Sequence, residues 1–343
     1  MTNRPLAFCD LDGWEGDDHE AALAAFRQSF EQLRADYPLL PEPGNEPARS
    51  YFEINFQPQR ATSGDSERGA FFTGYYEPIL RGSRLRSERF RVPLLRRPDD
   101  LVTLVDDHLR ASSGDALTHV RIMDDGSKVA FATREQIEGG CLDDQALALM
   151  YLDDAVDAFF LHIQGSGLIE LDYGERVRVS YSAKNGHPYT SIGRELIADG
   201  VFCEADMNLP ALVDWLKADP ERAQRTMWRN ASYIFFEERG PADEVSAVGA
   251  RNIPLTAGRS LAVDASLHAL GLPMFVSVDR LAGDGGAADF RRLMIAQDVG
   301  SAIRGPARGD IFYGTGEEAG RRAGVTRHFG NLYVLLPRAH GAG

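Results

Sequence analysis

The sequence predicts a mainly β protein of about two domains. The chain has 343 residues, which is more than a single core of typical size accommodates. From residue 231 onward, short β-rich runs alternate with Gly, Pro and Asp turns, a spacing typical of barrels and sandwiches. An Arg- and Pro-rich stretch from 81 to 100 indicates where the chain leaves one domain for another.

The N-terminal two thirds mixes helix and strand signals. Apolar residues at helical spacing predict one amphipathic helix from Asp18 to Tyr37, which Pro38 ends. Aromatic or apolar runs predict strands at 51–56, 70–76, 156–163 and 177–181. Ser191 is expected to cap a helix at 191–199, with Gly200 just past its end, and a further helix begins at Asn208.

The C-terminal third is expected to supply most of a barrel or sandwich. One helix is expected there, at 317–323. Its predicted strands are 233–236, 261–263, 274–278, 293–297, 310–313 and 332–336.

Composition excludes several classes of function. The net charge of −14 disfavours binding of nucleic acid, which relies on clustered Lys and Arg. No stretch approaches the roughly 18 apolar residues of a membrane span. The first nine residues lack the apolar core of a secretion signal, and Cys9 follows a bulky Phe, so lipid attachment there is not expected.

Metal and disulfide sites are not expected either. The three cysteines, Cys9, Cys141 and Cys203, are widely spaced and form no CxxC motif. The eight histidines show no HxxxH spacing, so we expect no metal and no other cofactor.

Two tempting motifs are incomplete. The run Gly165-Ser166-Gly167 resembles a phosphate loop, but neither GxGxxG nor GxxxxGK[ST] is present, so nucleotide binding is not expected. Ser166 also lacks the GxSxG context of a nucleophilic serine. His162 lies in an apolar run and is expected to be a packed core histidine rather than a ligand or base.

Four segments concentrate glycine, tyrosine and amide residues that a packed core does not need. Aromatic faces cover apolar C–H patches of sugars, and amides pair with hydroxyls, so this composition suits sugar binding. The segments are 72–78, 162–167, 183–190 and 297–316.

Asp298 and Asp310 are the candidates for acid–base chemistry. Each lies at the edge of an apolar run, and the step between them is rich in Gly and Pro, which can bring two carboxylates from neighbouring strand ends together. Paired carboxylates cleave glycosidic bonds. The residues alone leave open that Asp298 only caps a turn or pairs with Arg304 or Arg308.

The sequence resembles the membrane-bound lytic murein transglycosylase A family over residues 50–338. The motifs occur in the family's order, although Ser301 stands where a glycine is expected. The resemblance rests on Thr73-Gly74-Tyr75-Tyr76, Phe159 through Gly167, Lys184-Asn185-Gly186, Pro254 through Asp264, and Gln297 through Gly316.

The resemblance implies a double-psi β-barrel with a smaller inserted β-rich domain and a glycan groove between them. We place the barrel at 1–90 and 226–343 and the inserted domain at 91–225. The family's acid falls on Asp310, and its second motif aspartate on Asp298.

The implied reaction cleaves the β-1,4 bond between N-acetylmuramic acid and N-acetylglucosamine in peptidoglycan and forms a 1,6-anhydromuramyl product. One carboxyl group acts first as acid and then as base. The implied location is periplasmic and associated with the outer membrane, and other cell-wall proteins are conceivable partners. Expected substrate contacts are Tyr75 and Tyr76 as stacking surfaces, and Gln164, Ser166, Lys184, Asn185 and Tyr189.

Two alternatives stay open at the level of sequence. A water-using glycoside hydrolase would need a second carboxylate as base, for which Asp298 or Glu77 is available. A non-catalytic wall-binding module could use the same barrel, because fold alone does not fix function.

Overall fold

The computed structural model describes residues 6–62, 69–104, 118–123, 125–241, 247–281 and 288–338. The chain forms two compact units. Unit 1 comprises Met1–Tyr76, Val248–Gly314 and Glu318–Gly343, and unit 2 comprises Glu77–Ala247 with Thr315–Glu317. The chain thus leaves unit 1 after residue 76 and re-enters it at 248, whereas the boundaries drawn from the sequence lie at 90/91 and 225/226.

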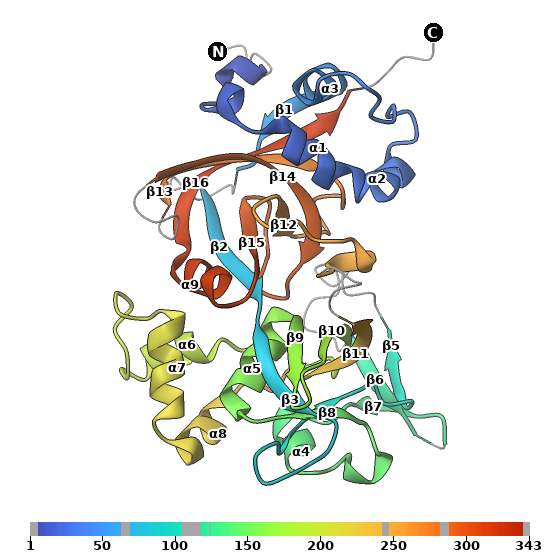
Figure 1. Ribbon diagram of the computed structural model, residues 1–343, viewed down its shortest axis with the longest axis vertical. Coiled ribbons are helices and arrows are strands. Elements are labelled where there is room, and N and C mark those ends of the chain that lie inside the picture. Colours follow the sequence, from blue (N-terminus) through green and yellow to red (C-terminus); the bar gives the residue numbers. More distant parts are fainter. Residues whose placement is uncertain are drawn as a thin grey trace. The chain divides into compact units, whose positions relative to one another are not determined.

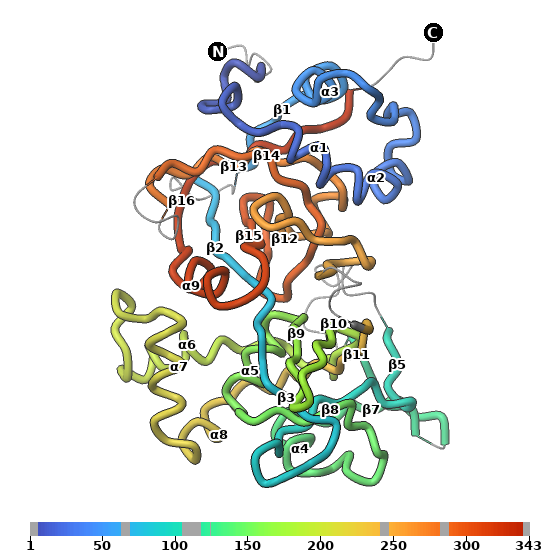
Figure 2. The backbone as a smooth tube through the Cα atoms, in the orientation of Figure 1, coloured from blue at the N-terminus to red at the C-terminus, as the bar shows by residue number. Residues whose placement is uncertain are grey.

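Unit 1 is built on a closed β-barrel. Six strands form the ring in the order β16-β13-β14-β12-β15-β2, which a β16–β2 ladder closes, and β1 pairs with the outer end of β16 (Figures 1 and 2). Closure pairs the edge strands, so the barrel lacks the free edge of an open sheet. The predicted mainly β barrel is confirmed. The strands are β1 (Phe56–Arg60), β2 (Ala70–Glu77), β12 (Ser260–Val263), β13 (Pro273–Leu281), β14 (Ala288–Val299), β15 (Arg308–Thr315) and β16 (Arg327–Pro337).

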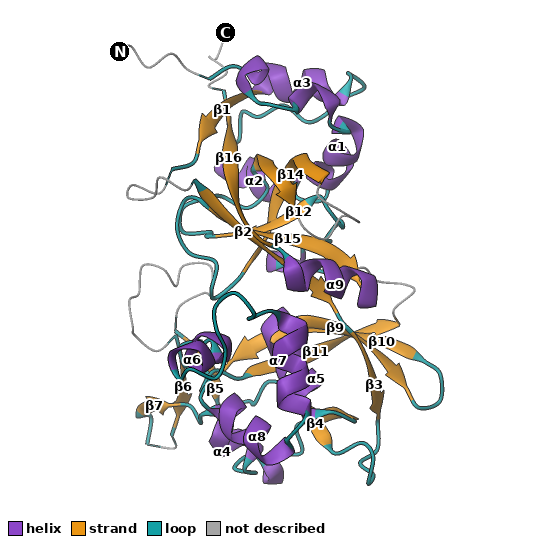
Figure 3. Ribbon diagram, turned by 90° about the vertical axis from the view of Figure 1, so that its left-hand side faces the viewer, coloured by secondary structure: helices purple, strands orange, loops and turns teal. Residues whose placement is uncertain are grey.

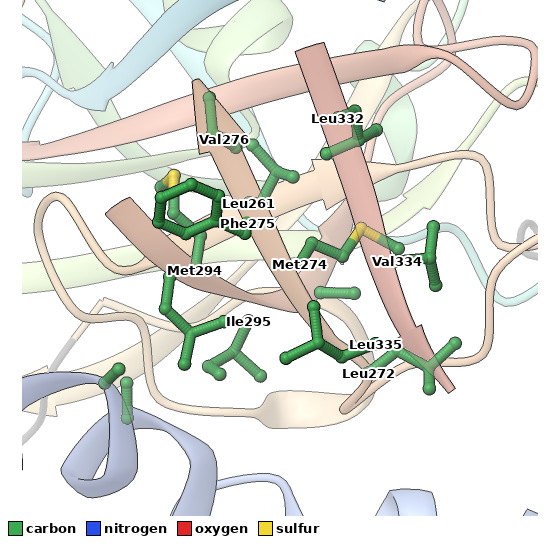
Figure 4. Close-up of a cluster of buried hydrophobic side chains, with 14 of the residues drawn as sticks. Leu261, Leu272, Met274, Phe275, Val276, Met294, Ile295, Leu332, Val334 and Leu335 are labelled. Carbon is green, nitrogen blue, oxygen red and sulfur yellow. The ribbon is translucent and has the colours of Figure 1, made fainter. Parts of the chain in front are cut away.

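The barrel core is made by apolar side chains from neighbouring strands. Met274 of β13 lies opposite Val334 of β16 and Met294 of β14 in the two ladders, and Figure 4 shows these side chains packed together. Phe275, on the other face of β13, packs at 5.4 Å on Trp14 of the N-terminal segment. Strands covered on both faces read as continuous apolar runs. This explains why β13 and β14 could be located from sequence.

Three N-terminal helices cover one end of the barrel (Figure 1). The single helix predicted at 18–37 is wrong, because the chain breaks at residues 28–29 into α1 (His19–Arg27) and α2 (Phe30–Asp36). The strand predicted at 51–56 is also wrong, since α3 (Ala48–Asn55) occupies this segment. The buried residues of α3 are 48, 51, 52 and 55, which is the i, i+3, i+4, i+7 spacing of a helix face.

Unit 2 contains a six-stranded sheet in the order β11-β10-β9-β3-β8-β4 and a three-stranded sheet, β5-β6-β7. The segment predicted as a domain boundary, 81–100, contributes strands to the larger sheet. The strands are β3 (Ile79–Ser83), β4 (Val92–Leu95), β5 (Leu101–Thr103), β6 (His119–Ile122), β7 (Lys128–Ala130), β8 (Ala148–Leu152), β9 (Ser166–Leu171), β10 (Arg176–Lys184) and β11 (Ile234–Pro241).

Helices pack together at one side of unit 2 (Figure 3). The strand predicted at 156–163 is wrong, because this run forms α5. Asp154 caps α5 by accepting from the backbone N–H groups of Val156 and Asp157, and Gly165 ends it at φ +83°. The cap predicted at Ser191 is confirmed, and so is the helix predicted from Asn208, which caps α7. The helices are α4 (Arg134–Glu138), α5 (Ala155–Gln164), α6 (Ile192–Ala198), α7 (Leu209–Lys217) and α8 (Pro220–Trp228), and unit 1 adds α9 (Glu317–Val325).

None of the helices in the described part of the chain is long and apolar enough to cross a membrane.

Candidate active site

Asp298 and Asp310 lie on strands that flank the same residue of the barrel. β12 is bonded to β14 on one side and to β15 on the other, and Ala262 is the partner of Asp298 in the first ladder and of Asp310 in the second. Directly paired residues point to the same face of a sheet. Strands are about 4.8 Å apart, so the two aspartate Cα atoms are separated by about 10 Å. On this face of the sheet, the only β12 side chain between the two aspartates is the small one of Ala262.

The carboxyl group of Asp310 is held from the neighbouring strand β2. The Thr73 hydroxyl donates a short hydrogen bond to Asp310 Oδ1. Burial raises the pKa of Asp310, while the Arg308 guanidinium and the Thr73 hydroxyl act in the opposite direction. Burial prevails, so Asp310 holds a proton at a higher pH than an ordinary aspartate does.

Arg308 bonds to the same hydroxyl group that holds Asp310. Its Nη2 donates to Thr73 Oγ1 at 2.6 Å. This bond fills one lone pair of Thr73 Oγ1, and the Thr73 hydroxyl donates its hydrogen to Asp310 Oδ1. Oδ1 of Asp310 is therefore the accepting oxygen, and Oδ2 is the atom left to carry the proton.

Asp298 is a second carboxyl group with altered acidity. Burial raises the pKa of Asp298 to about 6, and the charge of Asp310 adds to this increase. The Tyr75 hydroxyl and the backbone N–H groups of Val299 and Ala250 favour the ionised form and limit the increase. Val299 N donates to Asp298 Oδ1 at 2.8 Å.

A close backbone approach at Gly249 supports Asp298. A Cβ atom at this position would lie 2.5 Å from the Gln297 carbonyl oxygen and 2.9 Å from Asp298 Cγ, so only glycine fits. The neighbouring Gln297 is fully buried and donates to Ala25 O at 2.7 Å, which ties this strand to α1. The motif glutamine therefore has a structural role.

Tyr75 lies in the barrel wall with its hydroxyl beside Asp298. The side chain is buried, and its ring packs on Phe312 at 5.2 Å. The hydroxyl makes no hydrogen bond of regular geometry, yet it is close enough that Asp298 raises the pKa of Tyr75, after burial as the larger cause. Tyr76 is half-buried and packs on α9, where a Cβ at Gly320 would lie 2.7 Å from its ring. Neither environment is that of an open stacking surface for a sugar.

The side-chain amide of Asn185, in unit 2, makes its hydrogen bonds to the surrounding backbone. Its Nδ2 donates to the carbonyl oxygens of Ala132 at 2.9 Å and Ala231 at 2.8 Å, and its Oδ1 accepts from Tyr233 N at 2.9 Å. The next residue, Gly186, has φ +85° and leaves no room for a Cβ against β6. These contacts support a structural role for Asn185 rather than the predicted contact with substrate.

The other predicted contacts of unit 2 lie on several elements. Gln164 ends α5 and is partly exposed, and Ser166 begins β9 and is buried. Lys184 is buried at the end of β10, and Tyr189 is half-buried in the loop before α6. Burial raises the pKa of Tyr189, against a hydrogen bond with Ser191. Their roles toward substrate stay predictions.

Glu77, the alternative base, is locked in a buried ion pair. Arg178 binds both carboxylate oxygens, with Nε–Oε1 at 2.7 Å and Nη2–Oε2 at 2.9 Å. The Thr315 hydroxyl adds a bond to Oε2 at 2.7 Å. A carboxylate bound in this way is fully occupied and is a poor candidate for activating water.

Sequence reasoning missed Thr73 and Arg308. A signal was present, because Thr73 and Tyr75 alternate on one face of β2, and Arg308 precedes Asp310 by two residues on one face of β15.

The prediction that His162 is a core residue is confirmed, since it is buried and its ring packs on Tyr233 at 4.4 Å. The described residues contain no group of three or more His, Cys, Asp or Glu placed to hold a metal.

Comparison with known proteins places this site in a family. The MltA specific insert domain family matches residues 71–237, and the 3D domain family matches residues 259–336. Membrane-bound lytic murein transglycosylase A of Escherichia coli (strain K12) is 33% identical over 277 residues, covering 79% of this chain and 67% of that protein.

Solved structures agree with this match. A membrane-bound lytic murein transglycosylase from Agrobacterium tumefaciens has a TM-score of 0.86 at 35% identity, covering 97% of both chains. E. coli MltA with bound chitohexaose has a TM-score of 0.67 at 27% identity, covering 91% of this chain and 82% of that one. The barrel of unit 1 is thus a double-psi β-barrel, and the chain belongs to the membrane-bound lytic murein transglycosylase A family.

Proposed function

We propose that the chain cleaves the β-1,4 bond between N-acetylmuramic acid and N-acetylglucosamine and releases a 1,6-anhydromuramyl product, with Asp310 as the acting acid and base. The observation that carries the proposal is the setting of Asp310, whose pKa is raised by burial and whose Oδ1 is fixed by Thr73. The chitohexaose bound to the E. coli relative supports a glycan as the ligand. A murein substrate also supports a periplasmic location.

In the first step, Asp310 protonates the leaving oxygen. The proton sits on Oδ2, because Oδ1 accepts from Thr73. Cleavage leaves positive charge on C1 and its ring oxygen, which nearby negative charge stabilises. Asp298, opposite the same alanine, supplies this charge when it is ionised.

In the second step, the carboxylate of Asp310 removes the proton from the muramyl C6 hydroxyl as the C6 oxygen bonds to C1. One proton leaves Asp310 in the first step and one returns in the second, so the cycle closes without water. A single carboxyl group is sufficient for both steps.

Asp298 and Asp310 titrate as a pair in this proposal. The two negative charges oppose each other, so just below the Asp298 pKa of about 6 the pair holds one proton. A glycan that covers Asp310 removes water from it and favours its neutral form. The shared proton is thereby placed on Asp310 when substrate binds.

The mass of the muramyl product tests the mechanism. Glycan strands from purified murein are digested, and the products are weighed. We expect the anhydro form, which is about 18 mass units lighter than the reducing form that a water-using hydrolase releases. Reducing ends alone would identify a hydrolase with Asp298 as its base, because Glu77 is occupied by Arg178. Binding without any product would identify a wall-binding module.

A further inference from the structure

Asp310 belongs to a row of side chains on the outer face of the barrel. Asp310 and Ala262 are partners between β15 and β12, Thr73 bonds to Asp310 from β2, and Arg327 of β16 is the register partner of Thr73. The opposite face of these strands is the core, where Phe72 and Ile311 are fully buried. The row containing Asp310 therefore faces away from the core.

A second row lies two residues further along the same three strands. Arg308 of β15, Phe71 of β2 and Phe329 of β16 form it, and Phe71 and Phe329 are register partners with ring centroids 5.0 Å apart. The Arg308 guanidinium lies 5.0 Å from the centre of the Phe71 ring. The same guanidinium bonds to Thr73, so the second row is connected directly to the acid.

Phe329 does not serve the core. Phe329 is 47% exposed, whereas Leu332, three residues further along β16 and on the other face, is buried in the barrel core. Single exposed apolar residues need no explanation. Here, however, the exposed Phe329 packs on the half-buried Phe71 beside a cation. By strand geometry, Phe71 lies one strand across and two residues along from Asp310, about 8 Å away, and Phe329 lies two strands across, about 12 Å away. These distances are on the scale of neighbouring sugar units along a glycan strand.

We infer that Phe71 and Phe329 form a subsite that stacks a sugar unit near the bond being cleaved. The inference rests on the proposed function for the position of that bond. The C–H face of a pyranose is apolar and suits an aromatic floor. Arg308 and Arg327 give the same face positive charge, which suits the carboxylates of murein in an otherwise acidic protein.

The test uses Phe329, because Phe71 also contacts the guanidinium that orients Thr73. Binding of chitohexaose is measured by calorimetry with the full chain carrying Asp310→Asn, with and without Phe329→Ala. We expect Phe329→Ala to weaken binding about three- to tenfold, as for one lost aromatic contact. Phe329→Tyr should restore it within about twofold, because the ring is kept. In the enzyme with Asp310 intact, the same change should raise KM for murein glycan strands.

Ile54→Ala is the matched control, since Ile54 is a 63% exposed apolar residue of α3 in the same unit. Unchanged chitohexaose binding by a folded Phe329→Ala variant would overturn the subsite, and thermal melting establishes that the variant is folded. A second result would overturn stacking. If Phe329→Ala weakens binding but Phe329→Leu binds as well as Phe329→Tyr, the contribution is simple apolar contact and not stacking. Failure of the proposed function looks different, because the wild-type chain would then bind chitohexaose through Phe329 yet release no muramyl product.

Discussion

The Thr73 hydroxyl donates a hydrogen bond to Asp310 across 237 positions of sequence, and the same hydroxyl oxygen accepts a hydrogen bond from Arg308. The hydrogen bond therefore does more than hold the carboxyl group in place. It also determines which oxygen atom is free to carry the proton.

Removal of this hydroxyl should change both the rate and its pH dependence. Thr73 lowers the pKa of Asp310, so we expect Thr73→Val to raise it and to shift the alkaline limb of the kcat/KM profile to higher pH. The maximal rate should fall about tenfold or more, because Asp310 loses its orientation. Thr73→Ser keeps the hydroxyl and serves as the control. A slow Val variant with an unshifted profile would indicate that Thr73 contributes only to packing.

Asp310→Asn should fold normally and lose essentially all cleavage of murein. The amide can neither donate an acidic proton nor take one back. Release of soluble muropeptides measures the activity, and the melting temperature checks the fold. Ordinary turnover by this variant would remove Asp310 from its proposed role.

The wild-type enzyme should lose activity as pH rises through about 6, where the pair gives up its last proton. Asp298→Asn should lower the rate and move this limb to lower pH, because a neighbouring negative charge raises the pKa of a carboxyl group and its removal lowers it. The pH profile of kcat/KM on glycan strands measures both effects. An unmoved alkaline limb in Asp298→Asn would contradict coupling between the two aspartates.

Asn185→Ala should destabilise unit 2. Two carbonyl groups and one N–H group of the backbone lose their partner, at a cost of about 1–3 kcal/mol each when buried and unsatisfied. Urea unfolding of the full chain measures the loss, with the exposed Gln224→Ala as a comparison. Full stability combined with weak glycan binding would instead favour the contact with substrate expected from the sequence.

Chelators should leave activity unchanged, because the proposed chemistry uses a carboxyl group and no metal. Activity on murein is compared before and after dialysis against EDTA. Loss of activity that zinc or another divalent ion restores would refute this expectation.

A feature of this protein can be predicted from sequence when the residues that form it lie close together in the chain. The barrel strands β13 and β14 could be predicted, since burial on both faces leaves a continuous apolar run. The segment 156–163 could not be assigned by hydrophobicity, because a short apolar run suits a buried strand and a buried helix equally. Its caps, Asp154 and Gly165, were the decisive signals.

The site shows the same limit. Asp298 and Asp310 stand close together in sequence and could be paired by their turn-rich connection. Thr73 reaches Asp310 only because β2 lies beside β15 in the closed barrel. The alternation of Thr73 and Tyr75 along β2 indicates a shared face but does not identify β15 as the neighbouring strand. Asn185 is the opposite case. Its motif suggested a contact with substrate, but its side-chain amide is hydrogen-bonded to backbone groups up to 53 positions away.

Closure of the barrel has a consequence for biosynthesis. β2 pairs with β16, so the ring can close only after residues 327–330 have been synthesised and can pair with residues 70–73. Unit 2 comes almost entirely from the single stretch 77–247 and has no such delay. Contacts between distant segments carry the larger entropic cost and form late. The wall-cutting site is therefore assembled only when nearly the whole chain is available, and a prematurely terminated product would carry Asp310 without the closed ring that orients it.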